Sequence, residues 1–291
     1  MSSPDHAKIQ KVRDQLRQEW TGDATVTAWR KWHAQIAAFT RGATEAILET
    51  AQLRPGLRVL DLASGVGDPA LSIAANVAPS GRVTATDLGP GMISLAEELA
   101  RKNGLANIEF REANAESLPF ADESYDVLTC RFGVMFFPDL RKALGECLRV
   151  LKPGGRAVFV AWGVQEQPFF ATTGGIVMKH VPAPPPPPDP DGPSRSMFGE
   201  RGRLRAALEA AGFQNVREED RIVNGVWSGS LEKYWEQFTE VAAPFRPLIA
   251  QLTPGKRAQA EAEILAALKK FWNGKEMIMP LEIVIATGTR P

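Results

Sequence analysis

LRVLDLASGVGD, from Leu57 to Asp68, is the stretch that decides the fold of this chain. Its first half is an apolar run of strand length, its second half is a turn with two glycines, and residues 70–77 then read as a helix. Glycines between a strand and a helix let the backbone approach a ligand closely. The stretch therefore predicts a ligand-binding turn at the carboxyl end of a buried strand.

Strands and helices alternate on the carboxyl side of this turn. Further strands are predicted at 82–87, 107–111, 125–130 and 156–162, and helices at 92–102 and 140–151. We expect KPGG, residues 152–155, to form a helix stop and a tight turn. A helix at 203–211 closed by Gly212, a strand at 213–223, two amphipathic helices and a strand at 281–287 complete the chain. Such alternation is typical of a parallel sheet with helices on both faces.

The organisation outside the sheet follows from periodicity and composition. Residues 1–56 read as helices and form an N-terminal helical cap, which leaves 57–291 as the ligand-binding domain. Residues 182–193 include five consecutive prolines and are predicted to be a stiff, extended surface link rather than a docking site for a proline-reading module. The aromatic face of Tyr234, Trp235 and Phe238 on the first amphipathic helix is interpreted as core rather than as a substrate pocket.

Composition excludes several classes of function. The chain has 34 Lys and Arg against 34 Asp and Glu, so no charge surplus favours nucleic acid or an anionic membrane as a partner. Cys130 and Cys147 lie in apolar segments and predict buried thiols, and no cluster has metal-ligand spacing, so no metal is expected. The amino-terminal segment lacks an apolar signal region, and no window approaches ~20 uninterrupted apolar residues. We therefore expect a cytoplasmic protein without integral membrane association, and no oligomeric state is predicted.

Two carboxylates mark the expected ligand site. Asp61 ends the first strand, and Asp87 ends the second strand 26 residues later. These strand ends are neighbours in a doubly wound sheet, and a carboxylate there can accept hydrogen bonds from both hydroxyls of a ribose. The pairing fits any adenosine-containing cofactor. GVGDPA, residues 65–70, also satisfies the G-x-G-x-x-A dinucleotide fingerprint, so NAD remains an alternative.

Three further features favour S-adenosylmethionine (SAM) over NAD. Asp61 stands four residues before Gly65, where its charge would repel a pyrophosphate but suits an ammonium group and a sulfonium. Asn114 and the residues after it follow the third strand and can read the edge of an adenine. Arg131 and Phe132 follow the fourth strand, at the same edge of the sheet. The structural alternatives are that Asp61 caps the following turn and that Asp87 is an ordinary strand-end acid.

With these residues in view, the segment from Val59 to Trp162 resembles the class I SAM-dependent methyltransferases. It is most similar to the branch that includes the ubiquinone/menaquinone C-methyltransferases and many small-molecule methyltransferases. The resemblance implies a Rossmann-like fold, a seven-stranded, mostly parallel sheet with one antiparallel strand at its end. It is carried by the 61–68 loop, Thr86-Asp87, Asn114-Ala115-Glu116, Leu118-Pro119-Phe120, Tyr125-Asp126-Val127 and the segment 149–155.

The resemblance also implies roles for individual residues. Asp61, Ala63, Ser64 and Gly65 would surround the methionine portion of SAM, and Asp87 would hold the ribose hydroxyls. The adenine would be contacted by Leu88, Met92, Asn114 and Ala115. The floor of the site beside the methionine portion would be formed by Arg131 and Phe132.

The chain departs from the family pattern at two of these positions. Ala63 stands where the family often has Gly, and we expect the exchange to cost little because φ there is expected to be negative. Asn114 stands where the family often has Asp, and it can still accept from the adenine amino group. The family layout also makes residues from about 225 to 276 an insertion between the last two strands, and we expect it to cover the substrate side as a helical lid.

Methyl transfer from a sulfonium is an in-line displacement, so the protein mainly supplies proximity and alignment in a dry pocket. A base is needed only if the acceptor must lose a proton, and His33 is the candidate for it, ahead of His180. The sequence therefore predicts a SAM-dependent methyltransferase acting on a small, apolar or aromatic acceptor at oxygen, nitrogen or carbon. Two alternatives stay open: an NAD-dependent oxidoreductase, and a SAM-binding relative that does not methylate and acts as a cyclase or a binding protein.

Overall fold

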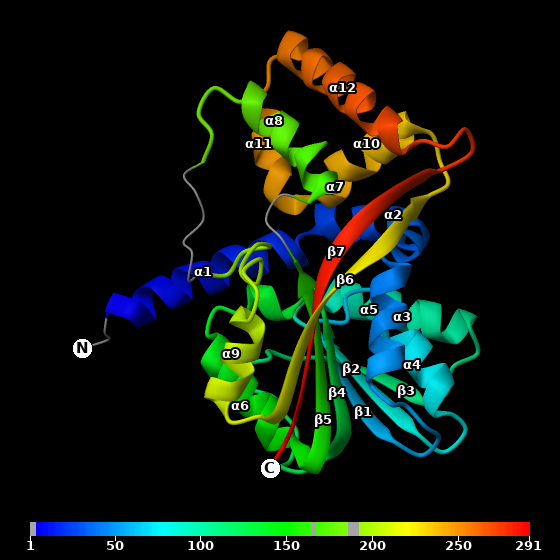
Figure 1. Cartoon of the computed structure of the whole chain (residues 1–291), viewed down its shortest axis with the longest axis vertical. Coiled ribbons are helices and arrows are strands. Elements are labelled where there is room, and N and C mark those ends of the chain that lie inside the picture. Colours follow the sequence, from blue (N-terminus) through cyan, green and yellow to red (C-terminus); the bar gives the residue numbers. More distant parts are fainter. Residues whose placement is uncertain (1–3, 164–166, 186–191) are drawn as a thin grey trace.

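A seven-stranded sheet forms the centre of the molecule (Figure 1). The computed structural model describes residues 4–163, 167–185 and 192–291 of the chain. The strands follow the order β3-β2-β1-β4-β5-β7-β6. Their bounds are β1 (Arg58–Leu62), β2 (Arg82–Asp87), β3 (Ile108–Glu112), β4 (Tyr125–Arg131), β5 (Leu151–Trp162), β6 (Gln214–Trp227) and β7 (Met277–Thr289).

The sheet is parallel except for one strand. β7 pairs antiparallel with both β5 and β6, so the last strand of the chain lies one position in from the edge of the sheet. The first five strands in space are joined by parallel pairing, with Val59 opposite Val83 on β2 and opposite Val127 on β4. This order confirms the predicted α/β fold class.

Helices cover both faces of the sheet, as Figure 1 shows. One face carries α3 (Arg41–Thr50), α4 (Ala70–Val77) and α5 (Pro90–Lys102), and the other carries α6 (Leu140–Val150) and α9 (Arg203–Ala211). Each face buries its own apolar cluster. Alternate residues of the strands feed the two clusters, which is why the strands read as continuous apolar runs.

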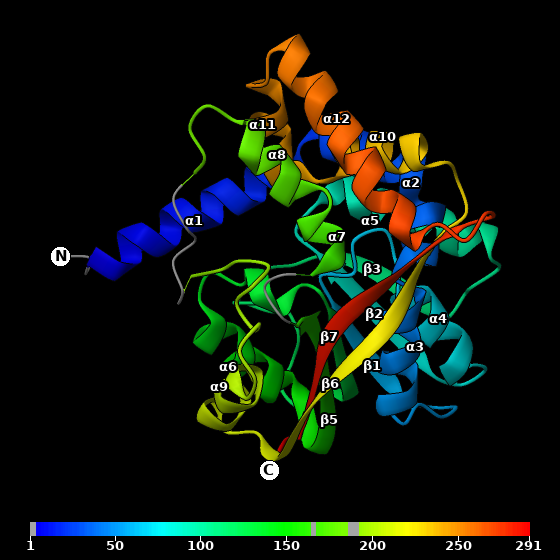
Figure 2. The same cartoon turned by 45° about the horizontal axis from the view of Figure 1, so that its top comes forward.

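A third group of helices lies beyond the carboxyl ends of the parallel strands (Figures 1 and 2). We call this group the cap from here on, and it is distinct from the N-terminal helices of residues 1–56. It consists of α7 (Pro168–Ala171), α8 (Gly174–His180), α10 (Leu231–Val241), α11 (Arg246–Ala250) and α12 (Pro254–Leu268). Its interior is a separate apolar cluster that includes Tyr234, Trp235 and Phe238, all buried. The interpretation of this aromatic face as core is therefore confirmed.

The amino-terminal helices connect the cap to the sheet. α1 (Pro4–Thr21) runs across the carboxyl edge of the sheet, and α2 (Asp23–Phe39) contacts α10 of the cap and α5 of the sheet layer. Short 3-10 turns complete the chain at η1 (Val134–Phe136), η2 (Ala243–Phe245) and η3 (Lys269–Phe271).

Several predicted elements need correction. Residues 152–155 do not form a free tight turn, because they lie within β5 as a bulge where pairing with β4 jumps from Leu151 to Arg156. The two last strands are longer than expected, and α7, α8 and α11 were not anticipated. The proline-rich link falls partly outside the described residues, since 186–191 are not described.

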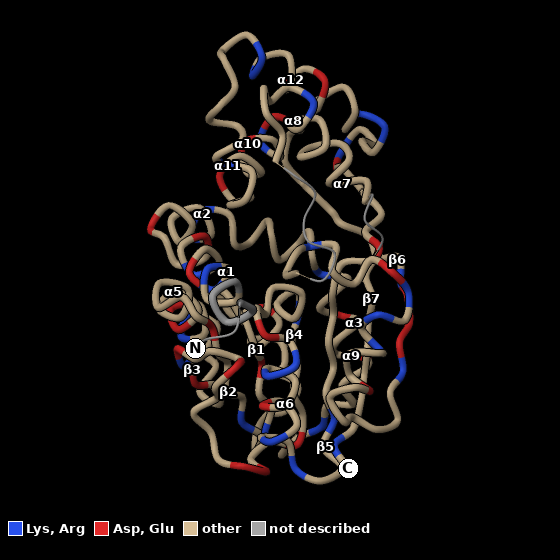
Figure 3. Tube along the Cα trace, turned by 90° about the vertical axis from the view of Figure 1, so that its left-hand side faces the viewer, with Lys and Arg blue, Asp and Glu red and all other residues tan. Residues whose placement is uncertain are grey.

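The surface shows no single sign of charge. Figure 3 shows that Lys and Arg are interspersed with Asp and Glu along the outer helices. No helix in the described part of the chain is long and apolar enough to cross a membrane. Within the same residues, no three His, Cys, Asp or Glu side chains gather as a set of metal ligands.

Candidate functional site

The carboxyl end of β1 places a buried acid beside the glycine turn. Asp61 has no exposed surface, and its Oδ1 accepts a hydrogen bond of 2.5 Å from the hydroxyl of Thr129 on β4. Its Oδ2 is buried and has no partner in the protein. Burial raises the pKa of the Asp61 carboxyl to about 7, against the opposing hydrogen bond from Thr129 and the charge of Arg131. A cationic ligand would satisfy the unpaired oxygen.

The turn after β1 has a positive φ at three residues. φ is +53° at both Ala63 and Gly65, and +101° at Gly67. The expectation of a negative φ at Ala63 is therefore wrong, and its methyl group is held in a conformation that normally favours glycine. The turn bonds back to the sheet through Ser64, whose N–H donates to Thr86 O over 2.9 Å, while the Ser64 hydroxyl is buried and unpartnered.

Gly133, in the segment after β4, leaves room for the side chain of Ala63. A Cβ placed on Gly133 would lie 2.4 Å from the Ala63 Cβ and 2.9 Å from Cys130 Sγ. Glycine is therefore required at position 133 by the methyl group that Ala63 adds to the turn. Ala63, which stands where the family often has glycine, and Gly133 are thus in close contact although they are 70 residues apart in sequence.

Asp87 organises the turn at the end of β2. Its Oδ2 accepts the Gly65 N–H and its Oδ1 accepts the Gly89 N–H, both over 2.9 Å. Burial raises the pKa of the Asp87 carboxyl, and these backbone donors oppose that shift. Leu88 is half-buried and Met92 is buried at the start of α5. Each carboxylate oxygen can accept a second hydrogen bond, so the side chain is able to hold two ribose hydroxyls as well.

The loop after β3 is held by its own side chains. Asn114 Oδ1 accepts the Glu116 N–H over 2.9 Å, which forms a local turn around the buried Ala115. Glu116 is itself 2% exposed, accepts the Asp139 N–H over 3.0 Å and forms an ion pair with Arg13 of α1. Through this pair α1 is attached to the loop that is predicted to contact adenine.

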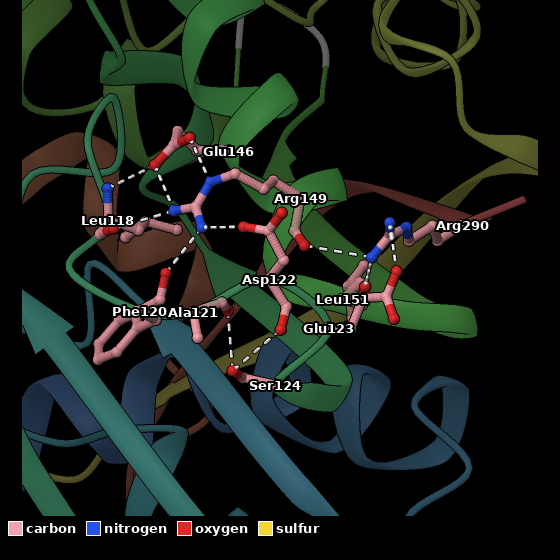
Figure 4. A network of polar contacts seen from close by, with 10 residues as sticks. All are labelled: Leu118, Phe120, Ala121, Asp122, Glu123, Ser124, Glu146, Arg149, Leu151 and Arg290. Atoms are coloured by element: carbon pink, nitrogen blue, oxygen red, sulfur yellow. Dashed lines mark hydrogen bonds and ion pairs between the residues drawn. The ribbon is translucent and has the colours of Figure 1, made fainter.

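An arginine fork on α6 braces the continuation of that loop (Figure 4). Arg149 donates to the carbonyls of Leu118 and Phe120 over 2.9 and 2.7 Å, and to Glu146 and Asp122 over 2.8 Å. Glu146 in turn accepts the Leu118 N–H over 2.7 Å. The family segments 118–120 and 149–155 are thus held together by hydrogen bonds, which gives both a structural role.

Arg131 at the end of β4 is committed to other protein groups. Its guanidinium contacts Asp68 Oδ2 at 2.5 Å and the Asp68 carbonyl at 2.9 Å, and it donates to the hydroxyls of Thr40 and Thr44. Its side chain is 8% exposed. Arg131 therefore ties the glycine turn to α3, and only its buried Nε lacks a partner.

Phe132 begins a row of aromatic rings at the same edge of the sheet. It has φ of +59° and stacks on Trp162 of β5, with ring centroids 3.9 Å apart and planes at 15°. Trp162 contacts Phe169 and Phe170 of α7 at 4.7 and 6.2 Å. Phe39 of α2 adds an edge contact with Phe169 at 6.3 Å. We call these five side chains the aromatic wall.

The sequence did not single out most of the wall. Phe132 was predicted at the site, whereas Trp162, Phe169, Phe170 and Phe39 come from three other segments. Trp162 ends a predicted strand at the ligand edge of the sheet, and that position was the available signal for it. α7 is too short for a helical periodicity, so its two phenylalanines gave no signal of a site.

His33 and His180 have hydrogen-bond partners outside the aromatic wall. His33 of α2 bonds through Nδ1 to the Arg30 carbonyl over 3.0 Å and lines a cavity of about 230 Å³ with Trp29, Val66 and Asp68. No wall residue lines that cavity. His180 of α8 contacts Glu263 of α12 at 3.0 Å, which joins two cap helices. The side chain of His6 lies outside the described part of the structure.

Comparison with known proteins decides the family. A family model described as the ubiE/COQ5 methyltransferase family matches residues 27–181, more than half of the chain. The chain belongs to this methyltransferase family. The SAM-dependent enzyme class, the cofactor and the resemblance expected from the sequence are thereby confirmed.

Individual relatives match to different extents. The ubiquinone/menaquinone biosynthesis C-methyltransferase UbiE of Shewanella halifaxensis is 32% identical over 178 residues, which cover 58% of this chain and 71% of that protein. The UbiE of Brucella abortus strain S19 is 45% identical over 116 residues, 40% of this chain and 43% of that protein. The chain thus matches less than half the length of the Brucella relative.

Solved structures share the fold. The YcgJ protein of Bacillus subtilis superposes with a TM-score of 0.56 at 23% identity, over 86% of this chain and 98% of that one. The [4+2]-cyclase SpnF superposes with a TM-score of 0.54 at 24% identity, over 86% of this chain and 80% of that one. At these identities the likeness concerns the architecture alone.

The residues present fit the cofactor of the family. The ammonium group of SAM is complementary to the unpaired Asp61 Oδ2, and its methionine carboxylate is complementary to the unpartnered hydroxyl of Ser64. Buried polar atoms without a partner are rare in folded proteins. Two of them in one turn, next to the ribose-type acid Asp87, are the mark of a polar ligand site.

Proposed function

We propose that this protein transfers the methyl group of SAM to a small, apolar or aromatic acceptor, at oxygen, nitrogen or carbon, by in-line displacement. The observation that carries the proposal is the aromatic wall. Its first ring, Phe132, directly follows the end of β4. Cys130 of β4 pairs with Leu62, the last residue of β1, so Phe132 lies close to the turn that follows β1. A flat apolar acceptor would lie against these rings beside the cofactor turn.

The cofactor would be held by the residues of the turn and of the two neighbouring strand ends. Asp61 and Ser64 would bind the methionine portion, with Ala63 and Gly65 surrounding it, and Asp87 would bind the ribose. Adenine would lie against Leu88, Met92 and Ala115, with Asn114 at its edge, and Arg131 and Phe132 would form the floor. Bound SAM supplies an electrophilic methyl group on a sulfonium.

The contribution of the chain itself is orientation and exclusion of water. The wall rings fix the plane of a flat acceptor, and the cap covers the carboxyl edge of the sheet, so that the reacting groups are aligned in an apolar environment. The wall carries no base, which favours an acceptor that is nucleophilic without losing a proton to the protein. His33, the candidate base, lines the cavity beside the cofactor turn and not the wall, so it would serve only an acceptor that reaches from the wall into that cavity.

Binding of the cofactor product tests the first half of the proposal. We expect isothermal titration to show micromolar binding of S-adenosylhomocysteine (SAH) and no binding of NADH. Asp87→Ala should abolish the SAH signal, whereas Glu112→Ala, which removes an exposed acid at the end of the next strand, should leave it unchanged. Binding of NADH in place of SAH would support the dehydrogenase alternative instead.

Methyl transfer itself tests the second half. Methyl-labelled SAM is incubated with a panel of phenols, arylamines and hydroquinones, and the label is followed into product. Phe170→Ala should lower the rate of label transfer and leave SAH affinity unchanged, because Phe170 belongs to the acceptor wall and contacts Trp162 rather than the residues assigned to the cofactor. SAH binding without transfer to any acceptor would point to the non-methylating alternative.

A further inference from the structure

Arg195 carries a partly buried positive charge for which the described residues provide no counter-charge. Its guanidinium carbon lies 4.0 Å from the ring centre of Phe170 and 5.5 Å from that of Phe245 in η2. Its Nε is buried and unpartnered, and no ion pair or hydrogen bond joins the guanidinium to a residue in the described ranges. Burial without a carboxylate lowers the pKa of this arginine.

Such an arrangement leaves the in-plane N–H groups of the guanidinium available to a ligand. Partial removal of a charge from water without a charged partner is unfavourable, and cation–π contacts offset only part of that effect. Phenylalanine rings interact with the faces of the guanidinium but leave its in-plane N–H groups without acceptors. Arg131, by contrast, is paired with Asp68.

Arg195 belongs to the acceptor side of the site. It stacks on Phe170, which contacts Trp162, and Trp162 stacks on Phe132. The backbone agrees, because the Ser194 N–H donates to the Met135 carbonyl in η1 over 3.0 Å. The guanidinium is therefore at the far end of the same row of rings whose near end follows β4.

We propose that the acceptor is an aromatic carboxylic acid, with its ring against the aromatic wall and its carboxylate paired with Arg195. This inference rests on the proposed function and adds the charge of its substrate. A carboxylate accepts two parallel hydrogen bonds from one guanidinium edge, the geometry that the stacked rings leave open. One unpaired arginine matches one negative charge, which favours a carboxylate over a dianionic phosphate.

The test compares an acid with its neutral isostere. SAH-saturated protein is titrated with 2-naphthoate and with 2-naphthamide, which share the ring and differ in charge. We expect the wild type to bind the acid at least 10-fold more tightly than the amide. Arg195→Gln should abolish this preference and leave SAH affinity unchanged. Arg201→Gln is the matched control, since Arg201 is an exposed arginine nearby in sequence that pairs with Asp220 on β6.

The outcomes separate this inference from the proposed function. If the wild type does not bind SAH, both the cofactor site and the carboxylate proposal are refuted. Normal SAH binding with equal affinity for acid and amide, or with no binding of either, would overturn the carboxylate proposal alone. A folding defect is read separately from the melting temperature, which we expect to change little in Arg195→Gln because the guanidinium has no ion pair to lose among the described residues. Arg195→Lys should retain part of the preference.

Discussion

At the scale of the residue, the ionisation of Asp61 links pH to cofactor affinity. The raised pKa of about 7 means that the free protein holds a proton on Asp61 below neutral pH, whereas an ammonium ligand requires the carboxylate. SAH affinity should therefore be constant above about pH 8 and fall as the pH is lowered through 7. Titration calorimetry at several pH values measures the slope, and buffers of different ionisation enthalpy measure the protons released.

The variant Asp61→Asn is the control for this slope. It should bind SAH more weakly at pH 8, by about 1.5–3 kcal/mol for a lost charged hydrogen bond, and its SAH affinity should not depend on pH near 7.

The pH dependence of the free energy of unfolding gives a second measurement of the Asp61 ionisation. The folded unliganded protein holds a proton that the unfolded chain releases between about pH 4 and 7, so this group's contribution to the free energy of unfolding decreases as pH rises through that window. An equal slope in wild type and variant would contradict the assignment.

The pair Ala63 and Gly133 gives a second expectation at this scale. Gly133→Ala should destabilise the protein by about 1–3 kcal/mol, because its Cβ would meet the Ala63 Cβ at 2.4 Å. Ala63→Gly removes that contact and also relieves the left-handed backbone, so the double variant should be more stable than Gly133→Ala alone. Rescue should be partial, since Cys130 Sγ still lies 2.9 Å away. A double-mutant cycle from chemical denaturation measures the coupling, and strictly additive effects would contradict the contact.

Residues of the site differ in how far the sequence could predict them. Asp61 and Asp87 lie in short motifs whose spacing is local, so their position at one edge of the sheet could be predicted. Trp162, Phe170 and Arg195 come from separate segments that only tertiary packing brings together. The positive φ at Ala63 could not be predicted either, because residues other than glycine rarely adopt it.

At the scale of the element, the positions of proline and glycine determined which boundaries could be predicted. α4 and β2 have the predicted bounds because Pro79 and Gly81 separate them sharply. The same residue types misled at 152–155, where proline and glycine signalled a turn but form a bulge inside a strand. α7 has four residues, fewer than periodicity can detect.

The attachment of α1 can be tested by removing the partly buried ion pair between Arg13 and Glu116. Arg13→Met should weaken SAH binding by about tenfold or less, at most about 1.4 kcal/mol, because Glu116 then loses the partner that ties α1 to the adenine loop. Amide exchange of α1 should become faster. Arg17→Met is the matched control, since its pair with Glu112 is exposed on both sides and contributes little. If the two variants behave alike, α1 is not part of the site.

At the scale of the whole molecule, β6 and β7 join the cap to the sheet. Both strands continue past the other five, as the yellow and red ribbons of Figure 2 show. Met277, Met279 and Leu281 of β7 belong to the cap core, whereas Ile283 and Ile285 belong to the core of the sheet. The alternation of elements could predict the sheet, but the cap combines residues 168–180 with 231–268 and depends on contacts between segments distant in sequence.

This shared ribbon implies that cap and sheet unfold together. Met279→Ala, in the cap core with no exposed surface, should lower the free energy of unfolding by about 2–5 kcal/mol. Hydrogen exchange in α12 and in β1 should report the same denaturation midpoint, and both midpoints should fall together in the variant. Ile222→Ala on β6 is the control, because that side chain is 72% exposed and its loss should change little.

Ligand binding gives a second test of whether the cap and the sheet unfold together. SAH at 100 times its dissociation constant should add about 2.7 kcal/mol to the unfolding free energy of any part of the chain that unfolds with the cofactor turn. We expect α12, which holds none of the proposed SAH contacts, to gain that full protection because β7 carries the cap into the sheet. Protection confined to the sheet, with a cap that melts at a lower midpoint, would show that the cap is an independently opening lid.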